Sequence, residues 1–351
     1  MLLPFDDPTG RTNPLRLAVL GASGLVGRSM LSLLARQDWI TGAPLALSSA
    51  RSAGLELPFG DGPVTCRDVA AADLASIDVA IFSAGGAASR HWAPRFVQAG
   101  AAVVDNSSAW RQDPAVPLVV PEVNGHLVGP GHRGIIANPN CSTIQIALPC
   151  AALERAAGLR EVHATTLQAV SGAGQGGHDE LVAQANGLAG GEQAGAERGG
   201  EVFPRRIAAN AIPEIGALDG SGFFEEELKV HRELRRILAR GDLAVTCTAT
   251  RVPVWNGHAA AVRAVLAQDV TLDEVVAALA AWPGLAVAPT SGEYRTPAEV
   301  SGDVSVHVGR VRHEPGRRDA VLFWVVADNL LKGAAWNAVQ IAARLAGAEA
   351  R

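Results

Sequence analysis

The chain has 351 residues, 48% of them hydrophobic, and single domains usually span roughly 100–200 residues, so two folded cores are expected and a small disulfide-stapled scaffold is excluded. The formal net charge is −5 with acidic and basic residues interspersed, which excludes the basic stripe that a DNA- or RNA-binding surface needs.

The first part of the chain alternates short apolar runs with helical stretches, which is typical of a parallel sheet with crossover helices. Residues 1–14 are expected to form a flexible extension. Strands are predicted at Leu15–Leu20, Leu45–Leu47, Asp78–Phe82 and Ala101–Val104. A helix follows the first strand, and another precedes Gly100, which is placed to end it in a left-handed conformation. We expect a Rossmann-like domain over residues 15–137.

After about Ala137 the predicted strands become longer and alternate between apolar and polar residues, which indicates an antiparallel or mixed sheet with one solvated face. A Gly-rich region at 172–200 precedes a charged helix at 224–239, and a capping box begins a helix at Thr271. We expect an α+β domain over residues 138–329, followed by a helix at 330–346. Its strands are predicted at Val162–Val170, Leu243–Val254, Val304–Val311 and Ala320–Ala327.

Three glycines stand between the first strand and the first helix. Gly21, Gly24 and Gly27 let a backbone turn sharply and approach a pyrophosphate, whose charge is favoured at a helix N-terminus. The alternative is a tight strand-to-helix turn without a ligand. Because this is the first such turn of the chain, we favour a dinucleotide site.

The end of the second strand distinguishes the two nicotinamide dinucleotides. An NAD site usually has a carboxylate there for the ribose 2′-hydroxyl, whereas an NADP site has a cation and small donors. This chain has Ser49, Arg51 and Ser52 there, with no acid before Glu56. NADP is therefore the predicted cofactor, with a solvated loop arginine as the alternative for Arg51.

Cys141 follows a predicted strand at Gly134–Ala137 and begins a predicted helix. Unpaired amides in the first helical turn stabilise a thiolate and could also receive an oxyanion. The other cysteines, Cys66, Cys150 and Cys247, have no such position and are expected to be small buried hydrophobes. We favour a nucleophilic role for Cys141; the alternative is that it is a buried cysteine at a helix start.

The four cysteines show no C-x-x-C pair, so neither a disulfide framework nor a metal site is predicted. No apolar run reaches membrane-spanning length and no secretory signal is present, so we expect a cytoplasmic protein. Nine histidines could supply a base, and spacing alone does not single one out. His258 follows a predicted strand end and turn, where a site residue could be displayed.

Taken together, the motifs resemble the aspartate-β-semialdehyde dehydrogenase family from about Leu17 to Ala343. The matching segments, in family order, are Gly21–Gly27, Ser49–Gly54, Phe82–Gly85, Asp105–Arg111, Asn138–Thr143, Gln168–Gly174, Glu226–Lys229, Arg251–His258 and Asp328–Ala335.

The resemblance implies roles for individual residues. Cys141 would be the nucleophile, His258 the acid/base and Gln168 a further catalytic residue. The role of Glu226 could belong to Glu225 or Glu227 instead, because these two acids flank it. Substrate would be bound by Arg111, Asn140, Glu226, Lys229 and Arg251. NADP would be bound by Gly21, Ser23, Gly24, Leu25, Val26, Ser49, Arg51, Ser52, Ser171, Gly172 and Asn329.

The family resemblance also implies a reaction. L-4-Aspartyl phosphate would be reduced to L-aspartate 4-semialdehyde through a thioester on Cys141, a step in lysine, threonine and methionine biosynthesis. Residues 15–137 with the helix at 330–346 would bind NADP, and residues 138–329 would carry catalysis and form a homodimer. The partners would be a small substrate and inorganic phosphate, with no metal, membrane or nucleic acid.

Other activities remain as alternatives. N-acetyl-γ-glutamyl-phosphate reductase has similar architecture and chemistry, but an acetylated substrate would not need Glu226. Glyceraldehyde-3-phosphate dehydrogenase would place an acid where Arg51 stands. A catalytically silent binding protein would have no chemical reason to keep Cys141, Gln168, Arg251 and His258 together.

Only two of the 30 basic residues are lysines, Lys229 and Lys332. In so arginine-rich a chain, a surviving lysine indicates a site that requires a compact ammonium. We expect Lys229 to face the substrate phosphate beside Arg111.

Overall fold

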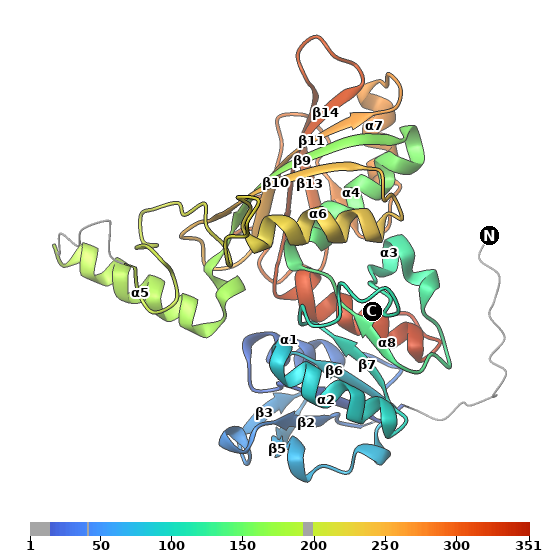
Figure 1. Ribbon diagram of the computed structural model, residues 1–351, viewed down its shortest axis with the longest axis vertical. Coiled ribbons are helices and arrows are strands. Elements are labelled where there is room, and N and C mark those ends of the chain that lie inside the picture. Colours follow the sequence, from blue (N-terminus) through green and yellow to red (C-terminus); the bar gives the residue numbers. More distant parts are fainter. Residues whose placement is uncertain (1–14, 41, 192–198) are drawn as a thin grey trace. The chain divides into compact units, whose positions relative to one another are not determined.

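The computed structural model describes residues 15–40, 42–191 and 199–351 (Figure 1). The extension expected at 1–14 lies outside them. Backbone contacts divide the chain into two compact units, Met1–Asn138 with Ala335–Arg351, and Pro139–Ala334. The chain thus returns to the first unit at Ala335 instead of at the expected residue 330, because the intervening segment packs within the second unit, where Gly333 lies against Cys141.

The first unit is built on a parallel sheet with the strand order β5-β2-β1-β6-β7-β8. Strands β1, β6 and β7 are buried along their whole length, as expected where helices cover both faces of a parallel sheet. The strands are β1 (Leu17–Leu20), β2 (Leu45–Ser48), β5 (Arg67–Asp68), β6 (Val79–Phe82), β7 (Ala102–Asp105) and β8 (Ile135–Ala137).

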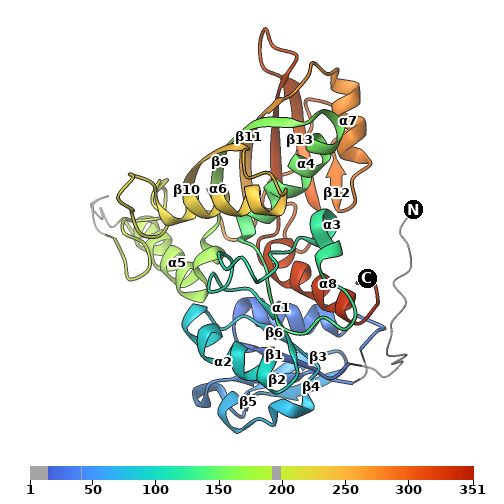
Figure 2. The ribbon, with the colours of Figure 1, turned by 45° about the vertical axis from the view of Figure 1, so that its right-hand side comes forward.

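The helices of this unit are α1 (Leu25–Leu34), α2 (Gly86–Gln98), α3 (Pro121–Asn124) and α8 (Trp336–Leu345). Ala93 and Phe96 of α2 pack with Ala80 and Phe82 of β6 in one buried cluster. Helix α8 contacts α1, β6 and β7 (Figure 2). Gly100, just after α2, has φ of 101°, which confirms the left-handed end of that helix. The Rossmann-like prediction is confirmed.

The second unit holds a mixed sheet with the strand order β10-β9-β11-β14-β13-β12. Its two outer pairs are parallel and its inner pairs antiparallel. Side chains alternate along β9, where Val162 and Ala164 are buried and His163 is exposed, so the prediction of a mixed sheet with one wet face is confirmed. The strands are β9 (Leu159–Gln168), β10 (Ala244–Arg251), β11 (His258–Leu266), β12 (Leu285–Val287), β13 (Val306–His313) and β14 (Ala320–Ala327).

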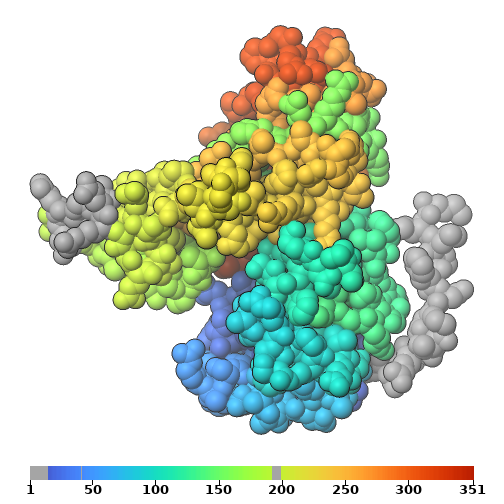
Figure 3. Space-filling model, viewed as in Figure 1, coloured from blue at the N-terminus to red at the C-terminus, as the bar shows by residue number. Residues whose placement is uncertain are grey.

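Helices pack against this sheet: α4 (Cys141–Ala157) contacts β11, α6 (Glu225–Ile237) contacts β10, and α7 (Leu272–Ala280) contacts β12 and β13. The yellow stretch of Figure 3, which includes α6, forms part of the surface of this unit. Thr271 and Glu274 form the predicted capping box at the start of α7.

Several elements were not anticipated. They are the hairpin of β3 (Glu56–Phe59) and β4 (Gly62–Thr65), β5, the short helix α3, the sheet strands β11 and β12, and α5 (Gln175–Ala189) inside the Gly-rich region. The helix expected at 330–346 is interrupted, because a π-helical turn at Leu331–Ala335 precedes α8.

Within the described ranges, no helix is long and apolar enough to cross a membrane. The same residues contain no group of three or more His, Cys, Asp or Glu side chains that could hold a metal ion.

Candidate active site

Cys141 is the first residue of α4, and Asn140 is the N-cap of that helix. The Asn140 side-chain Oδ1 accepts hydrogen bonds from the backbone N–H groups of Ser142 at 2.9 Å and Thr143 at 3.2 Å. Cys141 is partly exposed, whereas the other three cysteines are buried. The predicted position of Cys141 in a first helical turn is therefore confirmed, and its thiol is the accessible one.

Glu226, on the first turn of α6, is the hub of a buried hydrogen-bond cluster. It is 6% exposed, and its Oε1 accepts from the Asn140 amide at 2.7 Å and from the Gln168 amide at 3.1 Å. Its Oε2 lies 3.3 Å from Lys229 Nζ. Burial acts to raise the pKa of Glu226, but the Lys229 ammonium, these amide donors and Arg251 together lower it below the ordinary value. A buried carboxylate stays ionised here because it is surrounded by donors and cations.

The structure therefore distinguishes Glu226 from its two neighbours. Glu225 is half exposed and pairs with Lys229 at 3.0 Å. Glu227 points to the other side of the helix start, where it accepts from the backbone N–H groups of Phe224 and Ala249. Of the three acids, Glu226 is the one bonded to Asn140 and Gln168.

Arg251 lies next to Gln168 because their two strands pair in parallel and the residues are register partners at the strand ends. The Arg251 guanidinium is buried, donates to the Ala169 carbonyl oxygen at 2.8 Å and lies over the Phe203 ring at 5.9 Å. Burial lowers its pKa, while the negative charges of Glu226 and of the Cys141 thiolate act in the opposite direction. Arg251 thus shares an electrostatic environment with the candidate nucleophile.

His258 begins β11 and is fully buried. Its Nδ1 is 3.0 Å from the backbone N–H of Ala169 and accepts that hydrogen bond, so the proton of the neutral ring is on Nε2. Nε2 has no hydrogen-bond partner among the described residues. Burial and the Arg251 charge hold the pKa of His258 well below 6.5. The ring is therefore a neutral donor whose N–H remains available.

Two glycines allow close approach to these groups. A Cβ on Gly172 would lie 2.8 Å from Arg251 Nη1 and 3.1 Å from His258 Nε2. A Cβ on Gly333 would lie 2.8 Å from Cys141 Cβ. The candidate site therefore excludes even a methyl group at both positions.

Ser171 and Asn329 lie on a polar network beside the turn that leads to His258. Asn329 Oδ1 accepts from Ser171 Oγ at 3.0 Å and from the Gly257 N–H at 2.9 Å. Asn256 donates to Asp328 Oδ2 at 2.7 Å. These bonds connect Asp328 and Asn329, which precede α8, to the turn before His258 within the second unit.

In the first unit, the glycine turn fits a dinucleotide. A Cβ on Gly21, which has φ of 86°, would lie 2.3 Å from the Ser83 carbonyl oxygen, and one on Gly27 would lie 2.1 Å from the Gly21 carbonyl oxygen. Gly24 caps α1 without any side-chain hydrogen bond, so the N–H groups of Leu25 and Val26 can donate to a pyrophosphate.

The segment after β2 carries hydroxyls and a cation. Ser52 Oγ lies 3.4 Å from Ser23 Oγ of the glycine turn, and Ser49 and Arg51 are exposed. No acid stands at this strand end. The chemistry of these residues fits a phosphate better than a ribose diol.

Arg111, also in the first unit, is 8% exposed and held by two carbonyl oxygens. Its Nε donates to Asn138 at 2.9 Å and its Nη2 donates to Asn106 at 2.7 Å. The guanidinium is thus fixed in orientation.

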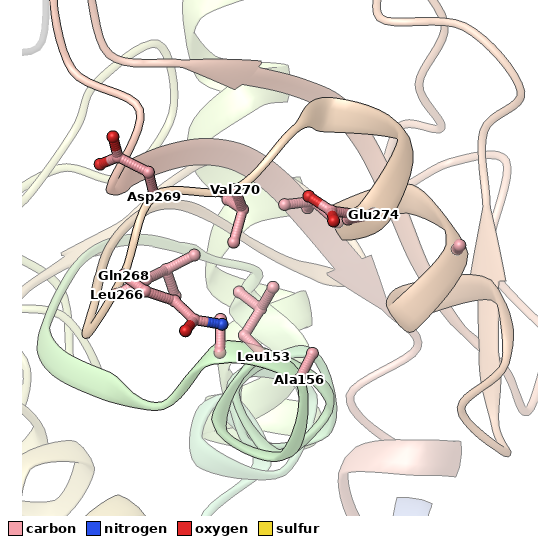
Figure 4. A pocket seen from close by; sticks show the side chains of 10 residues that line it. Leu153, Ala156, Leu266, Gln268, Asp269, Val270 and Glu274 are labelled. Atoms are coloured by element: carbon pink, nitrogen blue, oxygen red, sulfur yellow. The ribbon is translucent and has the colours of Figure 1, made fainter.

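Two cavities of the second unit differ in how they relate to these residues. Figure 4 shows one of about 350 Å³ between the end of α4, the end of β11 and α7, lined by Leu153, Leu266 and Val270. It contains none of the predicted site residues. The other, of about 410 Å³, has Arg251 on its wall together with Phe203, Glu201 and Glu214.

Sequence reasoning missed one residue in direct contact with the cluster. Glu233, on α6, is 1% exposed and accepts a hydrogen bond from the Asn140 backbone N–H at 2.6 Å. Its spacing from Glu226, two helical turns along the same face, was the available signal.

Comparison with known proteins agrees with this description. Residues 16–129 match a family model described as "Semialdehyde dehydrogenase, NAD binding domain", and residues 150–332 match "Semialdehyde dehydrogenase, dimerisation domain". The chain is thus assigned a nicotinamide-cofactor domain and a dimerisation domain.

Similar proteins include the aspartate-semialdehyde dehydrogenase of Bacillus subtilis, 40% identical over 94% of this chain and 97% of the relative. That of Legionella pneumophila is 39% identical over 93% of this chain and 94% of the relative. Among solved structures, aspartate semialdehyde dehydrogenase II from Vibrio cholerae, complexed with ASA, has a TM-score of 0.89 at 37% identity and covers 94% of this chain and 98% of that one. The chain belongs to the aspartate-semialdehyde dehydrogenase family, which makes it an oxidoreductase.

Proposed function

We propose that the chain reduces L-4-aspartyl phosphate to L-aspartate 4-semialdehyde with NADPH and release of phosphate, using Cys141 as nucleophile. The observation that carries the proposal is the partly exposed thiol at the start of α4, which shares its electrostatic environment with Arg251.

In the first step the Cys141 thiolate would attack the acyl carbon. The carbon–sulfur bond forms, the bond from that carbon to the phosphate oxygen breaks, and phosphate leaves with the electron pair. Covalent catalysis of this kind produces a thioester, which is easier to reduce than a carboxylate. NADPH, when bound, supplies the hydride for that reduction. The carbon–sulfur bond then breaks, which gives the aldehyde and returns the thiolate.

The carbonyl oxygen becomes an oxyanion at both tetrahedral stages. The Nε2–H of His258 is the donor proposed to stabilise it, because the N–H groups of Ser142 and Thr143 already donate to the Asn140 side chain. Because Nδ1 of His258 accepts from Ala169, the ring in this arrangement acts as a donor rather than as a base. Gln168, held by Glu226 and Thr166, would orient the acyl group.

Charged groups of the substrate have matching partners. Arg251 would bind the α-carboxylate with its planar fork, and Glu226 would bind the α-ammonium. Asn140 would fix that glutamate, while Lys229 and Arg111 would bind the phosphate. A free amine needs an acceptor such as Glu226, and the lowered pKa of that buried acid supports an aspartyl over an N-acetylglutamyl substrate.

NADP is proposed as the cofactor. The dinucleotide would be held by the turn residues Gly21, Ser23, Gly24, Leu25 and Val26, its 2′-phosphate by Ser49, Arg51 and Ser52, and its nicotinamide end by Ser171, Gly172 and Asn329. The absence of an acid at the end of β2 supports NADP over NAD. We further propose residues 138–329 as the part that carries catalysis and forms a homodimer, in a cytoplasmic enzyme that needs no metal.

The test is an assay of NADPH formation from aspartate semialdehyde, NADP and phosphate. Cys141→Ala should abolish the activity while the circular dichroism spectrum stays that of the parent. Cys247→Ala, which removes a buried thiol from β10, is the matched control and should remain active. An active Cys141→Ala enzyme would overturn the nucleophile.

A parallel assay with N-acetylglutamate semialdehyde tests the substrate. Preference for the acetylated aldehyde would reverse the assignment, and turnover of neither would favour a silent binding protein.

A further inference from the structure

The Pro139–Asn140 peptide, one residue before Cys141, is held by a carboxylate that the proposed chemistry does not use. Glu233 lies seven residues after Glu226 on α6, so both point from the same face of that helix. Glu226 accepts from the Asn140 side chain, and Glu233 accepts from the Asn140 backbone N–H at 2.6 Å. Helix α6 therefore holds Asn140 at two separate atoms.

Asn140 in turn determines where α4 begins. Its φ and ψ of −60° and 141° are extended, and its side-chain oxygen caps Ser142 and Thr143. A rotation of the peptide before Asn140 would move this cap and the Cys141 backbone together. The Asn140 N–H lies outside the capping interaction, so the Glu233 carboxylate is what fixes that end of the residue.

The hydrogen bond from Asn140 to Glu233 is strong enough to fix the orientation of this peptide. Glu233 is 1% exposed, and a hydrogen bond from an amide to a buried carboxylate is shorter and stronger than one between neutral groups. Such a bond also costs much to remove, because the amide left behind is buried without an acceptor.

We propose that Glu233 is a positioning residue: its carboxylate fixes the Pro139–Asn140 peptide, and with it the Asn140 cap of α4, so that the Cys141 thiol is presented to the acyl carbon. The inference rests on Cys141 being the nucleophile, as proposed above. Glu233 acts through the backbone and touches neither substrate nor cofactor. Its loss should therefore lower kcat and thiol reactivity while the KM for semialdehyde stays near the parent value.

The test compares Glu233→Leu and Glu233→Gln with Glu227→Gln. Glu227 is a second acid of α6 with two backbone bonds, but these go to Phe224 and Ala249, away from Asn140. The readouts are kcat, KM and the rate of iodoacetamide alkylation of Cys141, located by mass spectrometry, as a function of pH. Alkylation needs neither substrate nor cofactor, so it reports on Glu233 even if the proposed reaction is wrong.

We expect Glu233→Leu to lose roughly 10- to 100-fold in kcat and to alkylate more slowly, as for a lost bond to a charged acceptor. Glu233→Gln keeps an acceptor and should recover most of both, with a residual loss of about 3- to 10-fold because the bond is neutral. Glu227→Gln should lower the melting temperature without changing the alkylation profile.

The idea is overturned if Glu233→Leu folds and alkylates at the parent rate, or if Glu233→Gln is as impaired as Glu233→Leu. If Glu233→Leu does not fold, Glu233→Gln is the test. A Glu233→Gln enzyme with the kcat and the alkylation rate of the parent would overturn the inference. Failure of Cys141 as the nucleophile would appear separately, as activity retained by Cys141→Ala.

Discussion

A methyl group added at Gly172 tests whether Arg251 and His258 form one site. Gly172 is solvent-exposed and has no positive φ, so alanine adds no backbone strain and its effect comes from the contacts of the new methyl group. Its new Cβ would stand 2.8 Å from Arg251 Nη1, which is 0.6 Å inside the 3.4 Å at which ordinary contact begins. It would also stand 3.1 Å from His258 Nε2.

The guanidinium can move away only by weakening its 2.8 Å bond to the Ala169 carbonyl oxygen, because the other side of the side chain is buried. A hydrogen bond of a charged group contributes about 1.5–3 kcal/mol, which corresponds to roughly 10- to 150-fold in rate. Gly172→Ala should therefore reduce kcat/KM for aspartate semialdehyde by up to that factor and lower the melting temperature by several degrees, because the weakened bond also stabilises the fold.

The assay follows NADPH formation with each substrate varied in turn. Gly176→Ala is the matched control, since its Cβ would meet only a side-chain methyl of Val202 at 3.2 Å and the residue lies in α5. A Gly172→Ala enzyme whose kcat/KM for semialdehyde equals the parent's would refute the reasoning. An increase confined to the KM for NADP would assign the effect to the cofactor instead of Arg251.

Four further predictions concern three charged or titratable residues. His258→Ala should lower kcat by roughly 10²–10³-fold, as for the loss of one oxyanion donor, and a loss of less than about tenfold would point to another donor. The lowered pKa of His258 means that the unfolded chain binds more protons than the folded one below pH 6.5, so the parent should lose stability as the pH falls from about 7 to 5. His258→Gln should lose less stability over that range, and equal changes in the melting temperatures of parent and variant would contradict the lowered pKa of His258. Arg51→Asp should raise the KM for NADP and improve that for NAD, and an unchanged ratio would remove Arg51 from the 2′-phosphate. Lys229→Arg should raise the KM for phosphate, because a planar guanidinium replaces a compact ammonium held at 3.0 Å and 3.3 Å by Glu225 and Glu226, whereas unchanged kinetics would contradict that role.

The sequence did not reveal every strand of the sheet that carries the candidate site. Strand β11 was missed because its first residue, His258, is followed by three alanines, Ala259–Ala261, which have low strand propensity. They are tolerated because β9 and β14 flank the strand on both sides.

Helix α5 was not predicted because glycines weaken the helical pattern of its sequence. Gly177 disfavours a helix, yet a Cβ there would lie 2.5 Å from the Val170 carbonyl oxygen, so packing requires the residue that conceals the helix. Leu181 buries the helix against Phe203 and Ile207, which no local pattern reveals.

Motifs identified Cys141, Gln168, Glu226, Arg251 and His258 as candidates, but not how they bond to one another. The tautomer of His258 depends on the Ala169 amide, which comes from a different strand end. The role of Glu233 depends on packing between α6 and α4. Contacts of this kind arise only from tertiary structure.

The register of β9 with β10 has a consequence for changes in chain length. Gln168 and Arg251 are paired residues of adjacent strands, and a shift of one residue in a strand turns its side chains to the opposite face. Deleting a single residue inside β9, before Leu167, would place Ala169 beside Arg251 and turn Gln168 to the opposite face, although every motif would still be readable in the sequence. A gene that had suffered such a deletion would still look intact to a motif search, but its product would lack a correctly aligned site.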